Sequence, residues 1–395
     1  MTASRIDARV TTPGLLTSIA VTVAGAFVLL AGLLIAPEAI AISYLVAYTA
    51  TLAVVLGMLL LVMIAHLSGA IWFVLLRRRA ETVVAALPAL AVLMVPLLVA
   101  PQAFWPWAAP FDSLPTALQE ALRPKRTYFQ PGFFITRAIL YWIVWLAFGE
   151  ALCRLSRRQD SGTDGVPSDR LRAISAGGMP LVGFALTFAA FDWMMSLSPG
   201  WSSSVYGAYY FAGAIVAALA LLAIMASKAR ASSSQWSLTT EHFQALGRLT
   251  LAFVLFWGYL WYAQFFIVWI ADIPHEASWY LVRLTGAWGT MGFSVLAAGL
   301  PLPFVVLVFR AARGSAMVMS RLGAWLLAVH YGDVYWLLVP PLRADWSFVH
   351  LLWDVGALAL VGGSVAAVAI WRQASVPSVA AGDPLLEWSV RYEAP

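Results

Sequence analysis

The sequence predicts an all-α polytopic membrane protein, and three observations lead to this fold class. Of the 395 residues, 62% are hydrophobic and 11% are charged, whereas a soluble domain carries about 25% charged residues. The apolar residues form runs of about 20 residues or more, the length that crosses a bilayer as a helix. These runs lack the alternating pattern of barrel strands and are much longer than such strands.

Ten apolar runs meet this length, so we predict ten transmembrane helices and no sizeable soluble domain. The second run is long enough to tilt or to project beyond the bilayer. No small-residue cleavage site follows the first run, so we expect no signal peptide. The predicted spans are 14–36, 42–76, 82–100, 133–155, 174–197, 204–225, 243–271, 286–310, 316–338 and 348–371.

The cysteine and histidine content limits the cofactors that the chain can hold. Cys153 is the single cysteine, which excludes a disulfide framework, a cysteine-ligated zinc site and an iron–sulfur cluster held by this chain alone. Two b-type haems would need four axial histidines on facing helices. Of the five histidines, only His66 and His330 lie well inside predicted spans, and they lie in opposite halves. We therefore expect no metal site and no haem held by this chain.

The basic residues predict the orientation. Of the 24 Lys and Arg residues, 18 lie on the side that holds both predicted termini and 6 on the other side. Because cytoplasmic loops are enriched in Lys and Arg, this asymmetry predicts that both termini are cytoplasmic. The net charge of +5 therefore indicates membrane orientation and not nucleic-acid binding.

The outward connection 101–132 is the longest one and is rich in Trp, Phe and Pro. Because Trp and Tyr favour the headgroup layer, an interfacial aromatic belt explains this composition. The alternative is a docking surface for an extramembrane partner.

Ionisable groups inside the predicted spans are candidate functional residues, because a charge close to hydrocarbon is costly. The stretch 191–210, FDWMMSLSPGWSSSVYGAYY, places the carboxylate of Asp192 next to two aromatic residues at the outer end of a span. His66 and Glu150 lie in the inner halves of their spans, and Arg137 lies near the outer end of its span. The outer half also holds His330, Asp333, His350, Asp354 and Tyr206.

Two spacings favour proton exchange. His330 and Asp333 are three residues apart, and His350 and Asp354 are four apart, so each pair shares one helix face. A histidine beside a carboxylate can exchange protons near neutral pH. We therefore predict a proton relay, with Arg137 favouring the ionised form of a nearby carboxylate. The predicted relay comprises His66, Glu150, Asp192, His330 and Asp333, and Tyr206, His350 and Asp354 form a further candidate outer cluster.

Each candidate has an ordinary alternative. His350 and Asp354 suit the membrane interface near a helix start. Glu150 and Arg137 can cap or snorkel at helix ends. The stripe of Tyr206, Tyr209 and Tyr210 is typical of helix packing.

Five stretches of the chain resemble one family. They are HLSGAIWFVLLRRRAE at 66–81, YFQPGFFITRAILYWIVW at 128–145, FDWMMSLSPGWSSSVYGAYYFAGA at 191–214, LGRLTLAFVLFWGYLWYAQFFIVWIADIPHEASWY at 246–280 and HYGDVYWLLVPPL at 330–342. They resemble the NrfD-like family, the polysulfide reductase membrane subunits, and more closely the second NrfD-like membrane protein of the bacterial alternative complex III. The resemblance covers predicted spans two to nine.

The resemblance implies a fold and an assembly. The fold is two four-helix bundles, residues 42–200 (spans two to five) and 201–345 (spans six to nine). Segments 1–41 and 346–395 add the peripheral first and last spans. Such a subunit lies in the bacterial inner membrane and carries no cofactor. It lies beside a homologous quinol-binding subunit and under extracytoplasmic iron–sulfur and c-type haem subunits.

The resemblance also implies an activity. The complex oxidises quinol and passes electrons to cytochrome c or another acceptor, and its membrane subunits are expected to conduct protons through polar half-channels. The matching positions are His66, Arg137, Asp192, His330 and Asp333. Quinone or quinol is expected in the sister subunit, and a quinone site in this chain is the alternative. Two alternatives from other classes are a secondary transporter, since several prolines interrupt the spans, and a purely structural membrane anchor.

Overall fold

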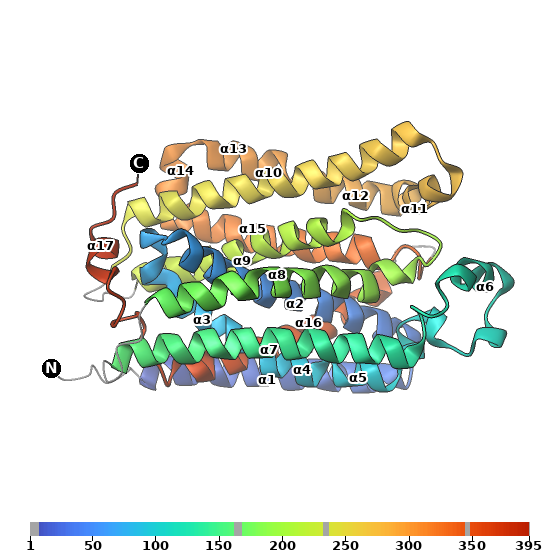
Figure 1. Ribbon diagram of the computed structural model, residues 1–395, viewed down its shortest axis with the longest axis horizontal. Helices are drawn as coiled ribbons and strands as arrows, with labels where there is room; N and C mark the ends of the chain where they lie inside the picture. The colour runs from blue at the N-terminus through green and yellow to red at the C-terminus, as the bar shows by residue number, and fades with distance from the viewer. Residues whose placement is uncertain (1–7, 162–167, 232–236, 344–347, 395) are drawn as a thin grey trace.

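The computed structural model describes residues 8–161, 168–231, 237–343 and 348–394, and within these ranges all regular structure is helical. The long helices lie side by side along the longest axis of the molecule (Figure 1). They are α1 (Ala8–Leu33), α2 (Pro37–Ser68), α7 (Pro131–Ser161), α8 (Ser168–Trp193), α9 (Tyr206–Ala231), α10 (Thr240–Ala271), α15 (Ala316–Leu338) and α16 (Leu351–Gln373).

Shorter helices complete the fold. Two broken segments run beside the long helices, and the others lie at the two ends of the molecule (Figure 1). The short helices are α3 (Val74–Val84), α4 (Leu87–Leu93), α5 (Val95–Val99), α6 (Thr116–Leu122), α11 (Pro274–Leu284), α12 (Gly286–Gly299), α13 (Pro301–Val308), α14 (Arg310–Gly314) and α17 (Leu386–Val390).

Nine helical segments in the described ranges are long and apolar enough to cross a membrane, which is consistent with a polytopic membrane protein. The predicted span 316–338 coincides with α15 but is not among the nine. This helix carries Arg321, His330 and Asp333, and these residues lower its hydropathy. The count of ten spans therefore stays a prediction.

The predicted boundary between the second and third spans is wrong. α2 ends at Ser68, eight residues before the predicted end of span 42–76, because Gly69 adopts the left-handed conformation (φ 60°). Its N–H donates to the Ala65 carbonyl and closes the helix in the way typical of glycine. The chain re-enters the apolar region as Ile71–Val99, where prolines at positions 88 and 96 break the segment into α3, α4 and α5.

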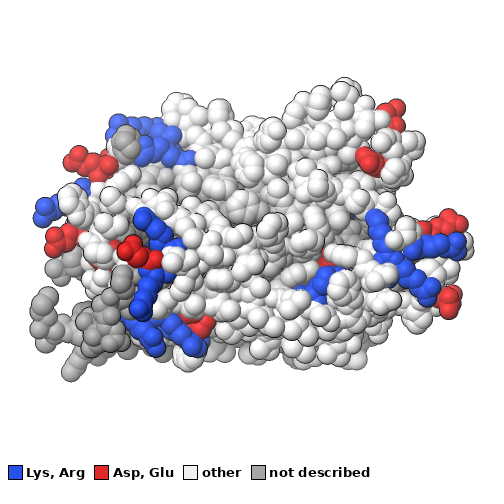
Figure 2. All heavy atoms as spheres, in the orientation of Figure 1, with Lys and Arg blue, Asp and Glu red and all other residues white. Residues whose placement is uncertain are grey.

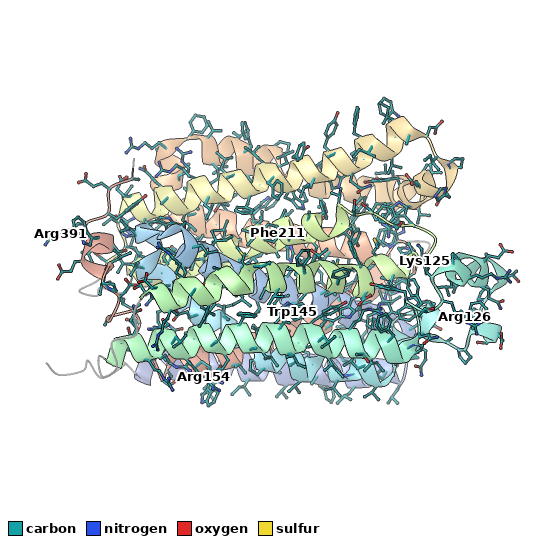
Figure 3. The ribbon with its side chains drawn as sticks, viewed as in Figure 1. Lys125, Arg126, Trp145, Arg154, Phe211 and Arg391 are labelled. Carbon is teal, nitrogen blue, oxygen red and sulfur yellow. The ribbon has the colours of Figure 1, made fainter. Side chains whose placement is uncertain are left out.

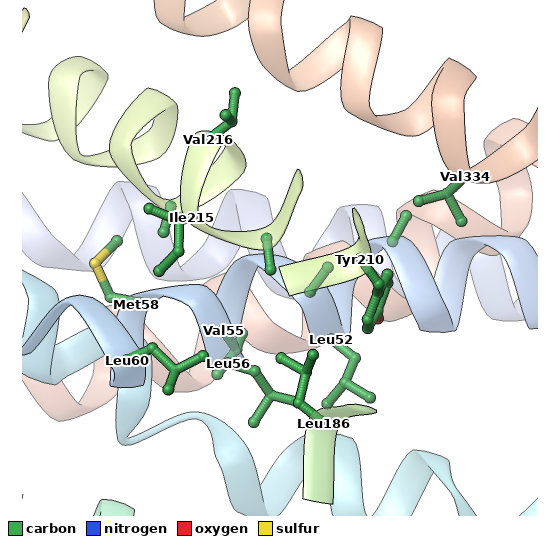
Figure 4. Packing of buried hydrophobic residues seen from close by; sticks show 14 of the residues in the cluster. Leu52, Val55, Leu56, Met58, Leu60, Leu186, Tyr210, Ile215, Val216 and Val334 are labelled. Carbon is green, nitrogen blue, oxygen red and sulfur yellow. The ribbon is translucent and has the colours of Figure 1, made fainter. Parts of the chain in front are cut away.

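Helices α2 and α9 form the centre of the molecule. In each, 72% of the most apolar window is buried, against 11% in α1. α2 packs against α8, α9, α15 and α16, which joins the two predicted bundles through one core. Figure 4 shows this core, with Leu52, Leu56 and Met58 of α2 facing Leu186 of α8 and Ile215 of α9.

The two ends of the molecule carry most of its charge. On the face shown in Figure 2, Lys, Arg, Asp and Glu gather toward the two ends, with a largely uncharged band between them. We call the end with α17 the tail end and the end with α6 the loop end. Arg154 and Arg391 lie at the tail end, and Lys125 and Arg126 at the loop end (Figure 3).

The close approach of α2 and α9 generates a test of the core. A Cβ added at Gly57 would lie 2.0 Å from the Ala214 carbonyl oxygen, so Gly57→Ala forces the two central helices apart. We expect a loss of about 1–3 kcal/mol in the free energy of unfolding, measured by denaturant titration in detergent. Gly183→Ala is the control, because a Cβ there meets nothing within 4 Å. Equal stability of the two variants would contradict this packing.

Candidate functional site

Asp192 lies near the end of α8 and is enclosed by hydrogen-bond donors. Arg137 of α7 donates from Nε to Oδ2 at 2.8 Å and from Nη2 to Oδ1 at 2.9 Å. The hydroxyls of Tyr128 and Tyr141 donate to the same two oxygens at 2.6 and 2.7 Å. The carboxylate is only 1% exposed and has donors on both oxygens, so this is a bidentate buried ion pair.

This ion pair also holds the loop end in place. Arg137 Nη1 donates to the Tyr128 carbonyl and its guanidinium lies 3.9 Å from the Tyr128 ring, so the last part of the loop is tied to α7. Burial raises the pKa of Tyr128 and the charge of Asp192 raises it further, so the phenol remains a donor. Trp105 donates to the Trp193 carbonyl and fixes the first part of the loop on α8. The sequence predicted a carboxylate near Arg137 without naming it, and the structure places Asp192 there. The two residues act together as a clamp.

Asp333 of α15 has a different environment. It is 3% exposed and accepts from the Tyr209 hydroxyl of α9 at 2.6 Å and from Trp257 Nε1 of α10 at 3.2 Å. Both donors are neutral, and within the described ranges Asp333 forms no salt bridge. A proton can therefore join or leave this carboxyl group without breaking an ion pair.

His330 lies one helical turn before Asp333. Its Nε2 lies 3.1 Å from the Ala50 carbonyl oxygen of α2, which can only accept, so Nε2 donates and Nδ1 is the acceptor of the neutral ring. His330, Asp333 and Trp257 line one cavity of about 20 Å³. This volume is enough for a single water molecule. His330 and Asp333 therefore line the same space, which we call the inner cavity.

A second cavity of about 20 Å³ lies toward the loop end and is lined mainly by aromatic residues. We call it the outer cavity. Trp201 stacks on Trp279 with ring centroids 4.5 Å apart, and Arg283 lies 3.7 Å from the Trp279 ring. Arg283 donates to the carbonyls of Trp279 and Leu337, and burial lowers its pKa to about 9. The remaining lining residues are Val205, Tyr206, Tyr209, Trp261, Gln264, Tyr280, Trp336 and Leu337.

Asp354 belongs to a third network at the loop end. Its Oδ1 accepts from the Ser43 hydroxyl at 2.5 Å, which joins α16 to α2. His350 is the residue before α16, and Asp354 lies in the first turn of that helix. Nearby, Arg343 donates to the Ala39 carbonyl and to the Tyr335 hydroxyl. These contacts fix the start of α16 against its neighbours.

At the tail end, the structure contains an ionic network that sequence reasoning missed. Arg77 pairs with Asp383 and Glu81, and Arg78 pairs with Glu81 and Asp160. All of these side chains are less than 10% exposed. In the sequence, the run of three arginines at 77–79 is typical of a solvated helix end. In the structure, the acidic partners of Arg77 and Arg78 come from α3, α7 and the residues after α16. Only the tertiary fold reveals the pairing.

His66 and Glu150 do not form an inner pair. His66 lines a cavity of about 130 Å³ at the tail end, together with Arg77, Arg172 and Asp383, and its Nε2 has no hydrogen-bond partner in the described parts of the chain. Such a volume holds about four water molecules. Glu150 lies elsewhere, in a surface ion pair with Arg154 at 2.6 Å.

The structure therefore divides the predicted residues among separate networks. Asp192 lies in the α7–α8 clamp, His330 and Asp333 share the inner cavity, Asp354 bonds to Ser43, and Tyr206 lines the outer cavity. Tyr209, which the sequence indicated as packing, donates a hydrogen bond to Asp333, and sequence reasoning missed this contact. Across the described ranges, no group of three or more His, Cys, Asp or Glu side chains could hold a metal ion.

The buried clamp predicts a large stability difference from a surface pair. Arg137→Gln leaves the Asp192 carboxylate buried without its cation, and we expect a loss of about 3–5 kcal/mol in the free energy of unfolding. Arg154→Gln is the control, since its side chain is 68% exposed and a pair of this kind contributes about 0–1 kcal/mol. Denaturant titration of both variants in detergent measures the difference, and equal losses would refute the clamp.

The tail-end network predicts that Asp383 fastens the residues after α16 to the helix bundle. Asp383→Asn removes the anion that pairs with Arg77, so limited proteolysis should cut the tail at least about tenfold faster. Glu387→Gln is the matched control, because Glu387 is an exposed acid on the same tail. Unchanged cleavage in Asp383→Asn would show that the pair does not hold the tail.

Comparison of the chain with protein-family models and with curated proteins returned no match. The chemistry of the site therefore has to be argued from its own geometry. In the described ranges, that geometry offers two buried carboxyl groups that accept hydrogen bonds from neutral side chains, Asp333 and Asp354, and two buried ion-pair networks.

Proposed function

We propose that this chain is an integral membrane subunit of a quinol-oxidising oxidoreductase of the alternative complex III type. In this proposal it supports quinol oxidation and relays protons, while haem and iron–sulfur partners carry the electrons. The five sequence stretches that resemble the NrfD-like family support the class of complex. The helical, apolar architecture is compatible with it.

The environment of Asp333 carries the relay part of the proposal. A buried carboxyl group needs hydrogen-bond partners, and it exchanges protons most readily when no fixed cation is paired with it. Asp333 has only Tyr209 and Trp257 as donors within the described ranges, and it shares a cavity with His330. A histidine and a carboxyl group on either side of one water molecule form a short path for a proton.

The orientation and the partners follow from the charge distribution and the family resemblance. We place the tail end, which has the larger number of basic residues, in the cytoplasm of a bacterial cell. The loop end then faces the extracytoplasmic iron–sulfur and c-type haem subunits. A homologous subunit lies alongside and provides the quinol site, so this chain holds no cofactor of its own.

A structural anchor is the second candidate, and one observation favours it. The α7–α8 clamp and the tail-end network are closed ion pairs, which is the arrangement expected of residues that hold a scaffold together. In that case Asp333 would be a further structural group, and its substitution would change stability without changing turnover.

Purification through a tag on this chain, with Asp333→Asn as the variant, tests the proposal. We expect c-type haem and iron–sulfur partners to co-purify and quinol oxidation to fall at least tenfold in Asp333→Asn, since a positioned proton-transfer group contributes about 10²–10⁴-fold. The complex is assayed with a soluble quinol and cytochrome c.

Glu150→Gln is the matched control, because it removes a carboxylate from the partly exposed pair with Arg154. Turnover in this variant should equal that of the unmodified complex. Isolation of the chain without haem or clusters would contradict the proposed complex. An intact complex with full turnover in Asp333→Asn would favour the anchor.

A further inference from the structure

Tyr209 stands between the two cavities beside Asp333. Its side chain lines the outer cavity, and its hydroxyl donates to Asp333, which lines the inner cavity. Tyr209 is 6% exposed, so its phenol group is buried where the outer cavity approaches the Asp333 carboxyl group. A proton moving between them at this point meets the phenol hydroxyl first.

The geometry holds this hydroxyl in position. The distance from the Tyr209 hydroxyl to Asp333 Oδ1 is 2.6 Å, which is short for a hydrogen bond between a hydroxyl and an oxygen. The Tyr209 ring lies 6.1 Å from the Trp257 ring, and Trp257 donates to the other oxygen of the same carboxyl group. Trp257 therefore contacts both the Tyr209 ring and the Asp333 carboxyl group to which Tyr209 donates.

We propose that Tyr209 transfers protons between the outer cavity and Asp333. This inference rests on the proposed function, in which Asp333 is a relay group. The phenol gives its hydroxyl proton to the Asp333 carboxylate and takes one proton from a water molecule in the outer cavity. The hydroxide left in the cavity is neutralised by a proton from the aqueous phase. The Tyr209 hydroxyl is restored, and one proton has moved from the outer cavity to Asp333. The reverse sequence moves a proton outward.

The residues around the outer cavity favour a hydroxyl relay over a free cation. Arg283 is buried behind Trp279, and its positive charge opposes a hydronium ion in the cavity. Tyr206 lines the same cavity, and no described residue accepts or donates a hydrogen bond at its hydroxyl. That hydroxyl is therefore available to a water molecule, for which the cavity has room.

Tyr210 provides a matched control on the next residue of α9. It is also buried, at 4% exposure, and its hydroxyl donates to the Thr49 carbonyl of α2 at 2.7 Å. Its hydroxyl bonds to backbone and has no contact with Asp333. Tyr209→Phe and Tyr210→Phe therefore each remove one buried phenol hydroxyl, and only the first removes a path for protons.

The test is hydrogen–deuterium exchange of the Asp333 carboxyl group, measured by infrared spectroscopy on the tagged complex at a pH where the group carries a proton. The band is assigned by its loss in Asp333→Asn. We expect at least tenfold slower exchange and a shifted band in Tyr209→Phe, with neither change in Tyr210→Phe. Exchange at the unmodified rate in Tyr209→Phe would overturn the inference.

A second variant keeps the test possible if the Tyr209→Phe protein does not fold. Difluorotyrosine at position 209 keeps the ring and the hydroxyl but makes the hydroxyl more acidic, so exchange at Asp333 should become faster. An unchanged rate would also overturn the inference. Exchange at Asp333 does not require quinol, so the two proposals can fail separately. If the chain shows no quinol oxidation but Tyr209→Phe still slows exchange, the proposed complex is refuted and the relay role of Tyr209 is supported.

Discussion

The hydrogen bonds that hold the Asp333 carboxyl group among neutral partners are the interaction on which the rest of the structure depends. A polar group buried away from water is costly unless it is hydrogen-bonded. Here the donors come from α9 and α10 while the carboxyl group belongs to α15, so three helices have to meet in a fixed register. His330, bonded to the Ala50 carbonyl, adds α2 to the same contact. One polar cluster thus ties together the second half of the chain and the central helix.

The two ends of the molecule satisfy the same constraint with full charges. At the loop end, Arg137 and two tyrosines surround Asp192 and secure the long connection before α7. At the tail end, Arg77 and Arg78 bind acids from α3, α7 and the segment after α16. Removing one partner of such a pair leaves a buried charge, so these networks are fixed. Asp333 has no ion-pair partner in the described ranges, so proton exchange at this carboxyl group does not require a salt bridge to break.

Sequence reasoning predicted the helical membrane class, because hydropathy and length decide it. The predicted bounds 316–338 also coincide with α15. It also predicted that Arg137 would lie near a carboxylate, and Asp192 is that carboxylate. It misplaced the end of α2, since the apolar run continues past Gly69 and only the left-handed backbone ends the helix there.

Contacts between distant segments were beyond reach of the sequence. Arg77 and Asp383 are 306 residues apart, and Tyr209 and Asp333 are 124 apart. Periodicity along one helix cannot show which helix lies opposite. For the same reason His66 and Glu150, which share a predicted depth, lie in different surroundings, one in a cavity and one in a surface ion pair.

The measurement that tests the account most directly is the infrared difference spectrum of the native complex before and after quinol addition. The account predicts a carboxyl band that changes on quinol oxidation, keeps pace with proton release and is absent in Asp333→Asn. Identical difference spectra for the unmodified complex and for Asp333→Asn would contradict the claim that this group carries protons.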